Sequence, residues 1–305
     1  MRYPTEQDLL DNWKGILYRN NNDIDRLGKY PLTDGEMAQI IEQIETLRTP
    51  LALNSFVNGR TVSITRDNKE DVAHFGKEIS LYIYDRKEIA GGKSTYQIAQ
   101  QPVYPAKNKM LNSRRGDLVL LINGMPLIHI ELKKSGIPVS QATNQIEKYA
   151  HEGVFTGLFR LVQIFVAMNP DDAVYFANPG VDKFNPSYYF HWADYNNEPI
   201  CGGQNPGKDE WKLFIGGTSG TAGLLSIPMA HQLIGFYTIA DSADGCLKVL
   251  RSYQYIAANA ISDVVRKCDW EQRPTTPGRP GGYVWHTTGS GKTCLLYTSD
   301  AADDR

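Results

Sequence analysis

Three side chains near the middle of the chain have residue types that together can hydrolyse a phosphodiester. They are Asp117, Glu131 and Lys133. Carboxylate oxygens are hard ligands of the kind that Mg²⁺ binds in proteins. A lysine close to such an ion can orient the attacking water or stabilise the charge that develops on the phosphate. The set therefore predicts a metal-dependent hydrolytic site.

A tight β-hairpin is expected to position this set. Residues 117–122 are rich in leucine and β-branched residues, Asn-Gly follows as the preferred two-residue turn, and residues 126–133 return. Side chains alternate between the faces of a strand, so His129, Glu131 and Lys133 share one face of the second strand. Charged residues on a solvated strand give the same pattern, but the apolar residues around them favour a buried site. We interpret the lone His129 as structural.

A predicted helix over residues 139–151 adds two polar side chains. Gln145 and Tyr149 are four residues apart, which puts them on one face of a helix. Because the helix follows the second strand closely, we expect this face to line a cleft beside the two carboxylates.

Three segments resemble, in this order, the PD-(D/E)XK nuclease core of type I restriction R subunits: Arg115-Gly116-Asp117, Ile130-Glu131-Leu132-Lys133 and Gln145-Ile146-Glu147-Lys148-Tyr149. The resemblance implies that Asp117 and Glu131 bind Mg²⁺ and that Lys133 is the catalytic lysine. It also implies that Gln145 and Tyr149, the Q-x-x-x-Y motif of that family, support nuclease activity.

The resemblance is incomplete around the aspartate and near the N-terminus. Gly116 stands where the name of the nuclease core implies a proline. Some members add a glutamate from an N-terminal helix, and Glu6 and Glu36 are the candidates here. Arg114 and Arg115 are either contacts for DNA phosphates or a solvated pair in a turn.

A nucleotide-binding pattern lies farther along the chain. Residues 286–293 end in Gly-x-Gly-Lys-Thr and follow an apolar segment, 282–285, that we expect to be a strand. Such a loop wraps the β-phosphate of ATP in backbone N–H groups, with its lysine on the β/γ oxygens and its threonine on Mg²⁺. The segment resembles the superfamily 2 helicase loop, in particular that of R subunits. The implied ATP contacts are Gly289, Ser290, Gly291, Lys292 and Thr293, with Gln254 as the residue of a Q-motif-like segment that reads adenine.

Residues 294–305 do not continue this pattern. A P-loop is followed by a long helix and by strands that carry an acidic Walker B motif, and the sequence has neither that motif nor an arginine finger. These residues look like the translation of a transposon-end adapter used in sequencing libraries. We therefore expect them to be non-native and expect this chain not to hydrolyse ATP.

The composition is that of an ordinary soluble protein. The 305 residues are 41% hydrophobic and 22% charged, which suits about two domains. A net charge of −2 does not by itself indicate nucleic-acid binding, although a cleft can be basic locally. No apolar run approaches the length of a membrane span. The four cysteines form no C-x-x-C pair, which argues against zinc and disulfides and suits the cytoplasm.

Periodicity and turn residues predict the remaining elements. The first fifty residues are expected to be helical, and Thr33 with Glu36 predicts a capping box at the start of the second helix. Strands are expected at 61–65, 78–84, 96–103 and 161–168. A polar and aromatic stretch follows to about residue 211, and a helix is expected at 247–266.

The predicted fold class is α/β. Residues 1–240 are expected to form a PD-(D/E)XK-like mixed sheet flanked by helices, and residues 241–293 the start of a RecA-like ATPase domain. By resemblance, the intact protein cuts double-stranded DNA with Mg²⁺, translocates DNA with ATP, and partners a methyltransferase subunit and a DNA-specificity subunit. Two alternatives stay open: another nuclease–helicase fusion in DNA repair or phage defence, and a DNA-binding or assembly module without nuclease activity.

Overall fold

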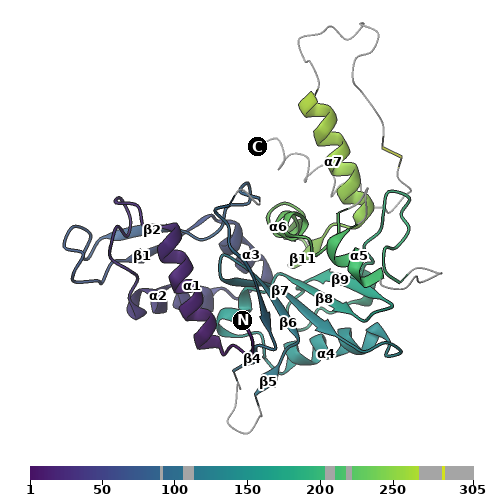
Figure 1. The fold of residues 1–305 in the computed structure, drawn as a ribbon, viewed down its shortest axis with the longest axis horizontal. Coiled ribbons are helices and arrows are strands. Elements are labelled where there is room, and N and C mark those ends of the chain that lie inside the picture. The colour runs from purple at the N-terminus through teal and green to yellow at the C-terminus, as the bar shows by residue number, and fades with distance from the viewer. Residues whose placement is uncertain (90–91, 106–112, 203–209, 218–221, 268–283, 286–305) are drawn as a thin grey trace, which may run out of the picture.

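The structure is a computed structural model of the 305-residue chain. It describes residues 1–89, 92–105, 113–202, 210–217, 222–267 and 284–285 (Figure 1). The nucleotide-binding loop predicted at 286–293 and the segment 294–305 lie outside these residues. The strand predicted at 282–285 lies partly outside them, and its described residues, Val284 and Trp285, belong to no strand.

A mixed sheet forms the centre of the described part of the chain (Figure 1). Its strands, in spatial order, are β3 (Tyr96–Gln100), β6 (Leu118–Ile122), β7 (Met125–Leu132), β8 (Ile164–Met168) and β9 (Ala173–Ala177). β7 and β8 pair in parallel, and the other neighbours in this sheet are antiparallel. β8 and β9 are buried along their whole length, as their apolar sequences require. The predicted mixed sheet is confirmed.

The predicted Asn-Gly turn joins β6 to β7. Asn123 and Gly124 have φ values of 52° and 84°, and two successive left-handed residues give the turn that matches the twist of a hairpin. The Asn123 side chain accepts a hydrogen bond from the Thr95 amide at 2.8 Å. Gly124 packs so closely on the first helix that a Cβ would lie 2.8 Å from Cα of Trp13. The turn is therefore fixed from two sides.

Helices and a small sheet form an N-terminal region beside the central sheet (Figure 1). Its elements are α1 (Glu6–Asn20), α2 (Asp34–Thr46), α3 (Pro50–Asn58), β1 (Thr61–Thr65) and β2 (Glu78–Tyr82). The predicted capping box is confirmed, because the Thr33 hydroxyl accepts from the Glu36 amide and the Glu36 carboxylate accepts from the Thr33 amide. The strand predicted at 78–84 ends two residues early, at Tyr82.

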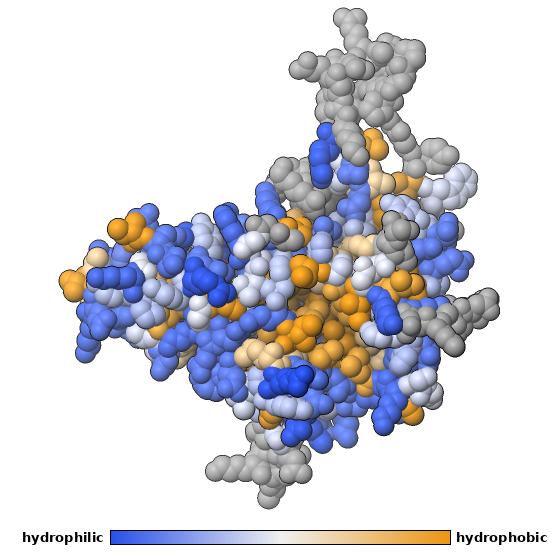
Figure 2. Space-filling model, in the orientation of Figure 1, coloured by the Kyte–Doolittle hydropathy of each residue, from blue (hydrophilic) through white to orange (hydrophobic). Residues whose placement is uncertain are grey.

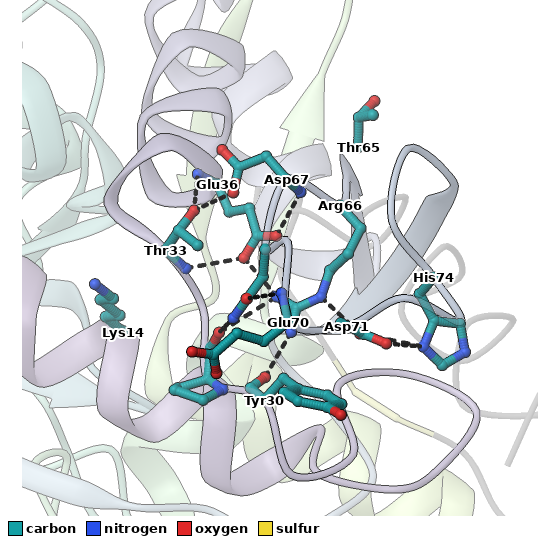
Figure 3. Close-up of polar contacts among 12 residues, drawn as sticks. Lys14, Tyr30, Thr33, Glu36, Thr65, Arg66, Asp67, Glu70, Asp71 and His74 are labelled. Atoms are coloured by element: carbon teal, nitrogen blue, oxygen red, sulfur yellow. Dashed lines mark hydrogen bonds and ion pairs between the residues drawn. The ribbon is translucent and has the colours of Figure 1, made fainter.

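A buried ion cluster ties α2 to the loop that follows β1 (Figure 3). The Arg66 side chain is fully buried, and its guanidinium donates to Glu36 at 2.6 Å and to Asp71 at 2.9 Å. The same group donates to the Tyr30 carbonyl at 2.6 Å. Buried charges are tolerated when they are paired and hydrogen-bonded, so this cluster holds the N-terminal region in one arrangement.

The two faces of the central sheet are covered differently. α4 (Val139–His151), with the predicted bounds, packs on β7 and β8, where Ile146 joins an apolar cluster with Phe165 and Phe176. On the other face, side chains of β3, β6 and β7 and of α5 (Glu210–Gly216) line an apolar cavity of about 320 Å³. Figure 2 shows hydrophobic side chains gathered over these central strands.

The C-terminal described elements are α6 (Ile227–Gly235), β10 (Thr238–Asp241), β11 (Cys246–Val249) and α7 (Ser252–Lys267). The helix predicted at 247–266 is wrong at its start, because its first residues belong to β11, which pairs with β10 and packs on β9. Leu247 and Val249 are buried while Lys248 is partly exposed, and this alternation belongs to a strand. The helix begins at Ser252.

Three further predictions are corrected. The strand predicted at 96–103 stops at Gln100 because Gln101 is left-handed, with φ 50°; β4 (Val103–Tyr104) then pairs with β5 (Arg114–Arg115). The strand predicted at 161–168 begins at Ile164, after the 3₁₀ helix η1 (Gly157–Leu161). The stretch to residue 211 contains β9 and the short 3₁₀ helix η2 (Pro186–Tyr188). None of the helices in the described residues is long and apolar enough to cross a membrane.

Candidate active site

The two predicted carboxylates lie side by side at one end of the hairpin. Asp117 directly precedes β6, and Leu118 pairs with Ile130, so Asp117 lies beside Glu131 on β7. The Asp117 carboxylate accepts a hydrogen bond from the Leu132 amide at 2.7 Å, which holds it against β7. Glu131 is 1% exposed, whereas Asp117 is partly buried.

The other three predicted residues join Glu131 in one hydrogen-bonded chain. The Lys133 ammonium donates to Oε1 of Glu131 at 3.0 Å and to Oε1 of Gln145 at 2.7 Å. The Gln145 amide donates to the Tyr149 hydroxyl at 2.7 Å, and that hydroxyl donates to the Arg115 carbonyl at 3.0 Å. α4 thus fixes the lysine through residues one helical turn apart, as their spacing predicts.

The carboxylates differ in the cost of carrying a charge. Burial alone would raise the pKa of Glu131, but the nearby His129 and Lys133 hold it below its ordinary value. The pKa of Asp117 is raised, chiefly by burial and further by the negative charge of Glu131, against the opposing effect of the Leu132 amide. The site therefore disfavours a second negative charge, and a cation between the carboxylates would relieve that repulsion.

His129 and Tyr104 form the buried side of the site. The Tyr104 hydroxyl lies 2.8 Å from Nδ1 of His129. Nε2 of His129 lies 3.5 Å from Oε2 of Glu131, and neither of these two buried atoms has a hydrogen bond of good geometry. Sequence reasoning gave His129 only a structural role and did not single out Tyr104. Strand alternation had already put His129 on the face of Glu131, but no local pattern links Tyr104 with a residue 25 positions away.

The site has two carboxylates to offer a metal ion. Within the described residues, no group of three His, Cys, Asp or Glu side chains is arranged to hold a metal. Asp117 and Glu131 still fit a divalent ion of the magnesium type, which usually binds one or two protein carboxylates and keeps several waters. The buried Oε2 of Glu131 makes no hydrogen bond of good geometry, so a cation would occupy a lone pair that the 3.5 Å contact with His129 leaves open.

Gly116 occupies the position of the proline in the nuclease pattern for a local steric reason. Its amide donates to the Pro102 carbonyl at 3.1 Å, a bond that proline could not make. A Cβ at this position would lie 2.5 Å from the Tyr104 hydroxyl. The departure from the pattern thus makes room for the tyrosine that contacts His129.

The remaining candidates near the site have other contacts. Arg114 donates two hydrogen bonds to Glu152, each at 2.9 Å, and Arg115 is exposed with its guanidinium 5.8 Å from the Tyr3 ring. Glu36 belongs to the buried cluster around Arg66. Glu6 accepts from the Leu158 amide at 2.8 Å, and burial raises its pKa. The described contacts of the two glutamates do not include Asp117 or Glu131.

Gln254 lies on α7, away from the carboxylates. It is buried, and its Oε1 accepts from the Arg251 amide at 2.9 Å. It lines a cavity of about 240 Å³ together with Arg251, Tyr188 and Phe190. Gly289, Ser290, Gly291, Lys292 and Thr293 lie outside the described residues, so their position relative to this cavity is a prediction.

Comparisons with known proteins agree on one family. The family model described as the type I restriction enzyme R protein N terminus matches residues 2–184. One relative is the endonuclease subunit of the type I restriction enzyme SauCOLORF180P from Staphylococcus aureus (strain COL). It is 32% identical over 293 residues, which cover 95% of this chain and 27% of that protein. The SsaAORF53P endonuclease subunit of Staphylococcus saprophyticus is 30% identical over 96% of this chain and 27% of its own length. The EcoprrI endonuclease subunit of Escherichia coli is 29% identical over 69% of this chain and 62% of its own length. The chain thus spans about a quarter of the length of its staphylococcal relatives.

Proposed function

The chain belongs to the family of type I restriction enzyme R proteins, whose N-terminal region it matches, and on this basis we propose that Asp117, Glu131 and Lys133 form a Mg²⁺-dependent nuclease site that cuts double-stranded DNA. The names of the relatives, all endonuclease subunits of restriction enzymes, support a nuclease. They also favour this assignment over a nuclease–helicase fusion of another kind.

The buried Glu131 carboxylate is the observation that carries the proposal. Its Oε1 is bonded to Lys133, while its buried Oε2 makes no hydrogen bond of good geometry and faces Nε2 of His129 at 3.5 Å. Leaving a buried polar atom unsatisfied costs on the order of 1–3 kcal/mol, and more when the group is charged. A binding site for a cation gives a reason for such a cost, because Glu131 lies beside a second carboxylate, Asp117, whose pKa its negative charge helps to raise.

The chain's own residues would divide the chemistry between them. Asp117 and Glu131 would hold the ion, which when bound polarises the phosphate and activates water. Lys133 presents a positive charge beside them, fixed by Gln145, and would stabilise the charge that develops on the phosphate. The Tyr149 hydroxyl donates to the Arg115 carbonyl and accepts from the Gln145 amide, and these two bonds hold Gln145 in place.

The first test is metal binding to the 305-residue chain. We expect calorimetry to detect Mn²⁺ or Mg²⁺ binding to the wild type and to detect none in Asp117→Ala or Glu131→Gln. Asp34→Ala, which removes a carboxylate whose side chain is 96% exposed, is the control and should bind like the wild type. Binding that persists in both site variants would exclude this pair as the metal site and would favour the DNA-binding or assembly module.

For the full-length protein we propose the complete activity of the family. Residues 1–240 would form the nuclease domain, and residues 241–293 would begin an ATPase domain that translocates DNA. ATP would contact Gln254 and residues 289–293, with a methyltransferase subunit and a DNA-specificity subunit as partners. The buried Gln254 beside a cavity with aromatic walls supports this assignment for the adenine base. Loss of nucleotide binding in Gln254→Ala of the full-length protein, measured with a fluorescent ATP analogue, tests it.

A further inference from the structure

A buried chain of three side chains continues from the proposed metal site into the protein interior. It runs from the Tyr104 hydroxyl to Nδ1 of His129 at 2.8 Å, and from Nε2 of His129 to Oε2 of Glu131 at 3.5 Å. Tyr104 and His129 are both 0% exposed. We propose that His129 is a positioning residue. Tyr104 orients its ring so that an Nε2–H points at Oε2 of Glu131, and this contact keeps Oε1 of Glu131 toward Lys133. This inference rests on the nuclease site proposed above.

The tautomer of His129 follows from what its two nitrogen atoms face. If Nδ1 carried the only proton, the lone pair of Nε2 would face a carboxylate oxygen at 3.5 Å in a buried site, which is repulsive. If instead the Tyr104 hydroxyl donates to Nδ1, the proton sits on Nε2 and faces that oxygen. The second arrangement pairs a donor with an acceptor at both ends of the ring.

The surroundings of the ring leave it little freedom to turn. Phe155 lies edge-to-face with it at 5.4 Å and Phe165 at 6.0 Å, while Tyr149 is 6.4 Å away. These neighbours are aromatic, so the polar contacts described for the ring are the Tyr104 hydroxyl at Nδ1 and the Glu131 carboxylate at Nε2. A ring fixed in this way can hold a carboxylate in one rotamer.

Glu131 needs such a partner on its buried side. Lys133 contacts Oε1 alone, so nothing on the lysine side stops the carboxylate from turning about its last bond. A donor behind Oε2 distinguishes the two oxygen atoms. In metal sites, partners that orient a ligand typically change metal affinity about 10–100-fold when they are lost.

Paired substitutions at His129 separate positioning from packing. In the 305-residue chain, His129→Phe keeps an aromatic ring but removes the donor, and we expect Mn²⁺ affinity measured by calorimetry to fall at least about 10-fold. His129→Gln retains an amide N–H that can reach Glu131 and should restore most of that affinity. His231→Phe is the matched control, because His231 is equally buried but contacts Tyr96 and the Asp85 carbonyl instead. It should lower the melting temperature and leave Mn²⁺ affinity unchanged.

A metal-free measurement tests the same inference independently. Long-range ¹H–¹⁵N spectra of the wild-type chain should show the Nε2–H tautomer of His129, and Tyr104→Phe should remove this preference. An Nδ1–H tautomer, or a His129→Phe variant that binds Mn²⁺ as tightly as the wild type, overturns the positioning role. Wild-type protein that binds no Mn²⁺ overturns the proposed metal site instead, and the tautomer still decides whether His129 orients Glu131.

Discussion

Lys133 is held between two oxygen atoms that fix where its positive charge sits. Glu131 accepts from one side at 3.0 Å and Gln145 from the other at 2.7 Å, so in the proposed nuclease site the ammonium would be in place before DNA binds. Preorganised charges stabilise a transition state without the cost of moving at the moment of reaction. The neighbouring Lys134 is exposed, with no described partner of this kind.

Lys133→Met is expected to reduce DNA cleavage by the full-length protein on the order of 100-fold or more, the typical effect of losing one such donor. Because the two proposed metal ligands stay in place, Mn²⁺ affinity should change far less than in Asp117→Ala. Plasmid cleavage and calorimetry measure the two effects. Lys134→Met is the control, and an equal loss of cleavage in both variants would point to a general effect of positive charge on DNA binding.

At the scale of elements, the turn between β6 and β7 positions the site together with the register shift between Leu120 and Leu121, because the two set how the strands pair beside Asp117. Gly124 has φ 84° and packs against the backbone of Trp13 on α1, whereas Gly136 has φ 81° with nothing within 4 Å of an added Cβ. The two glycines share the same backbone constraint and differ only in the space around them.

We expect Gly136→Ala to lower the free energy of unfolding by about 1–2 kcal/mol, the cost of a left-handed L-residue. Gly124→Ala should cost about 1–3 kcal/mol more, because the methyl group overlaps the α1 backbone. Urea unfolding of the two variants gives the comparison. Equal losses would mean that α1 moves away from the turn without cost.

The ion cluster of Figure 3 makes a second prediction at this scale. Arg66→Met leaves Glu36 and Asp71 buried without their cation, which typically costs about 3–5 kcal/mol. Lys14→Met, which breaks the exposed pair with Asp34, should cost less than about 1 kcal/mol. Thermal or urea unfolding distinguishes them, and similar losses would contradict a special role for the cluster.

At the scale of the whole molecule, the predictable features were those with a local pattern. Alternation and the Asn-Gly turn predicted the hairpin, and the spacing of Gln145 and Tyr149 predicted their place in the site. Contacts between distant residues carried no such signal: Glu36 and Arg66 are 30 positions apart in the chain. The start of β11 was misjudged because a short apolar run suits a buried strand as well as a helix.

His231 links parts of the chain that are far apart in sequence, since it connects α6 to β3 and to the segment after β2. Its Nε2–H donates to the Asp85 carbonyl at 2.9 Å, and its Nδ1 accepts from the Tyr96 hydroxyl at 2.8 Å. The Tyr84 ring stacks on it at 4.7 Å. A neutral imidazole makes both hydrogen bonds as described, whereas a proton added to Nδ1 would require the Tyr96 hydroxyl to turn and accept.

Stability should therefore depend on pH through this residue. Burial lowers the pKa of His231 below the ordinary 6.5, against the opposing effects of the Asp85 carbonyl and of Glu88. The unfolded chain then takes up a proton at a higher pH than the folded chain does. The contribution of the neutral His231 to the free energy of unfolding is therefore fully present above about pH 6.5, and it is lost as the pH falls through the pKa of His231 in the folded chain. In that window the free energy of unfolding should fall by up to about 1.4 kcal/mol per pH unit, the value for one proton.

Urea unfolding of wild type and His231→Gln from pH 7.5 to 5 isolates this dependence, because glutamine can make both hydrogen bonds but does not titrate. Identical pH slopes for the two proteins would show that His231 is protonated without cost, and that the junction it forms does not require the neutral ring.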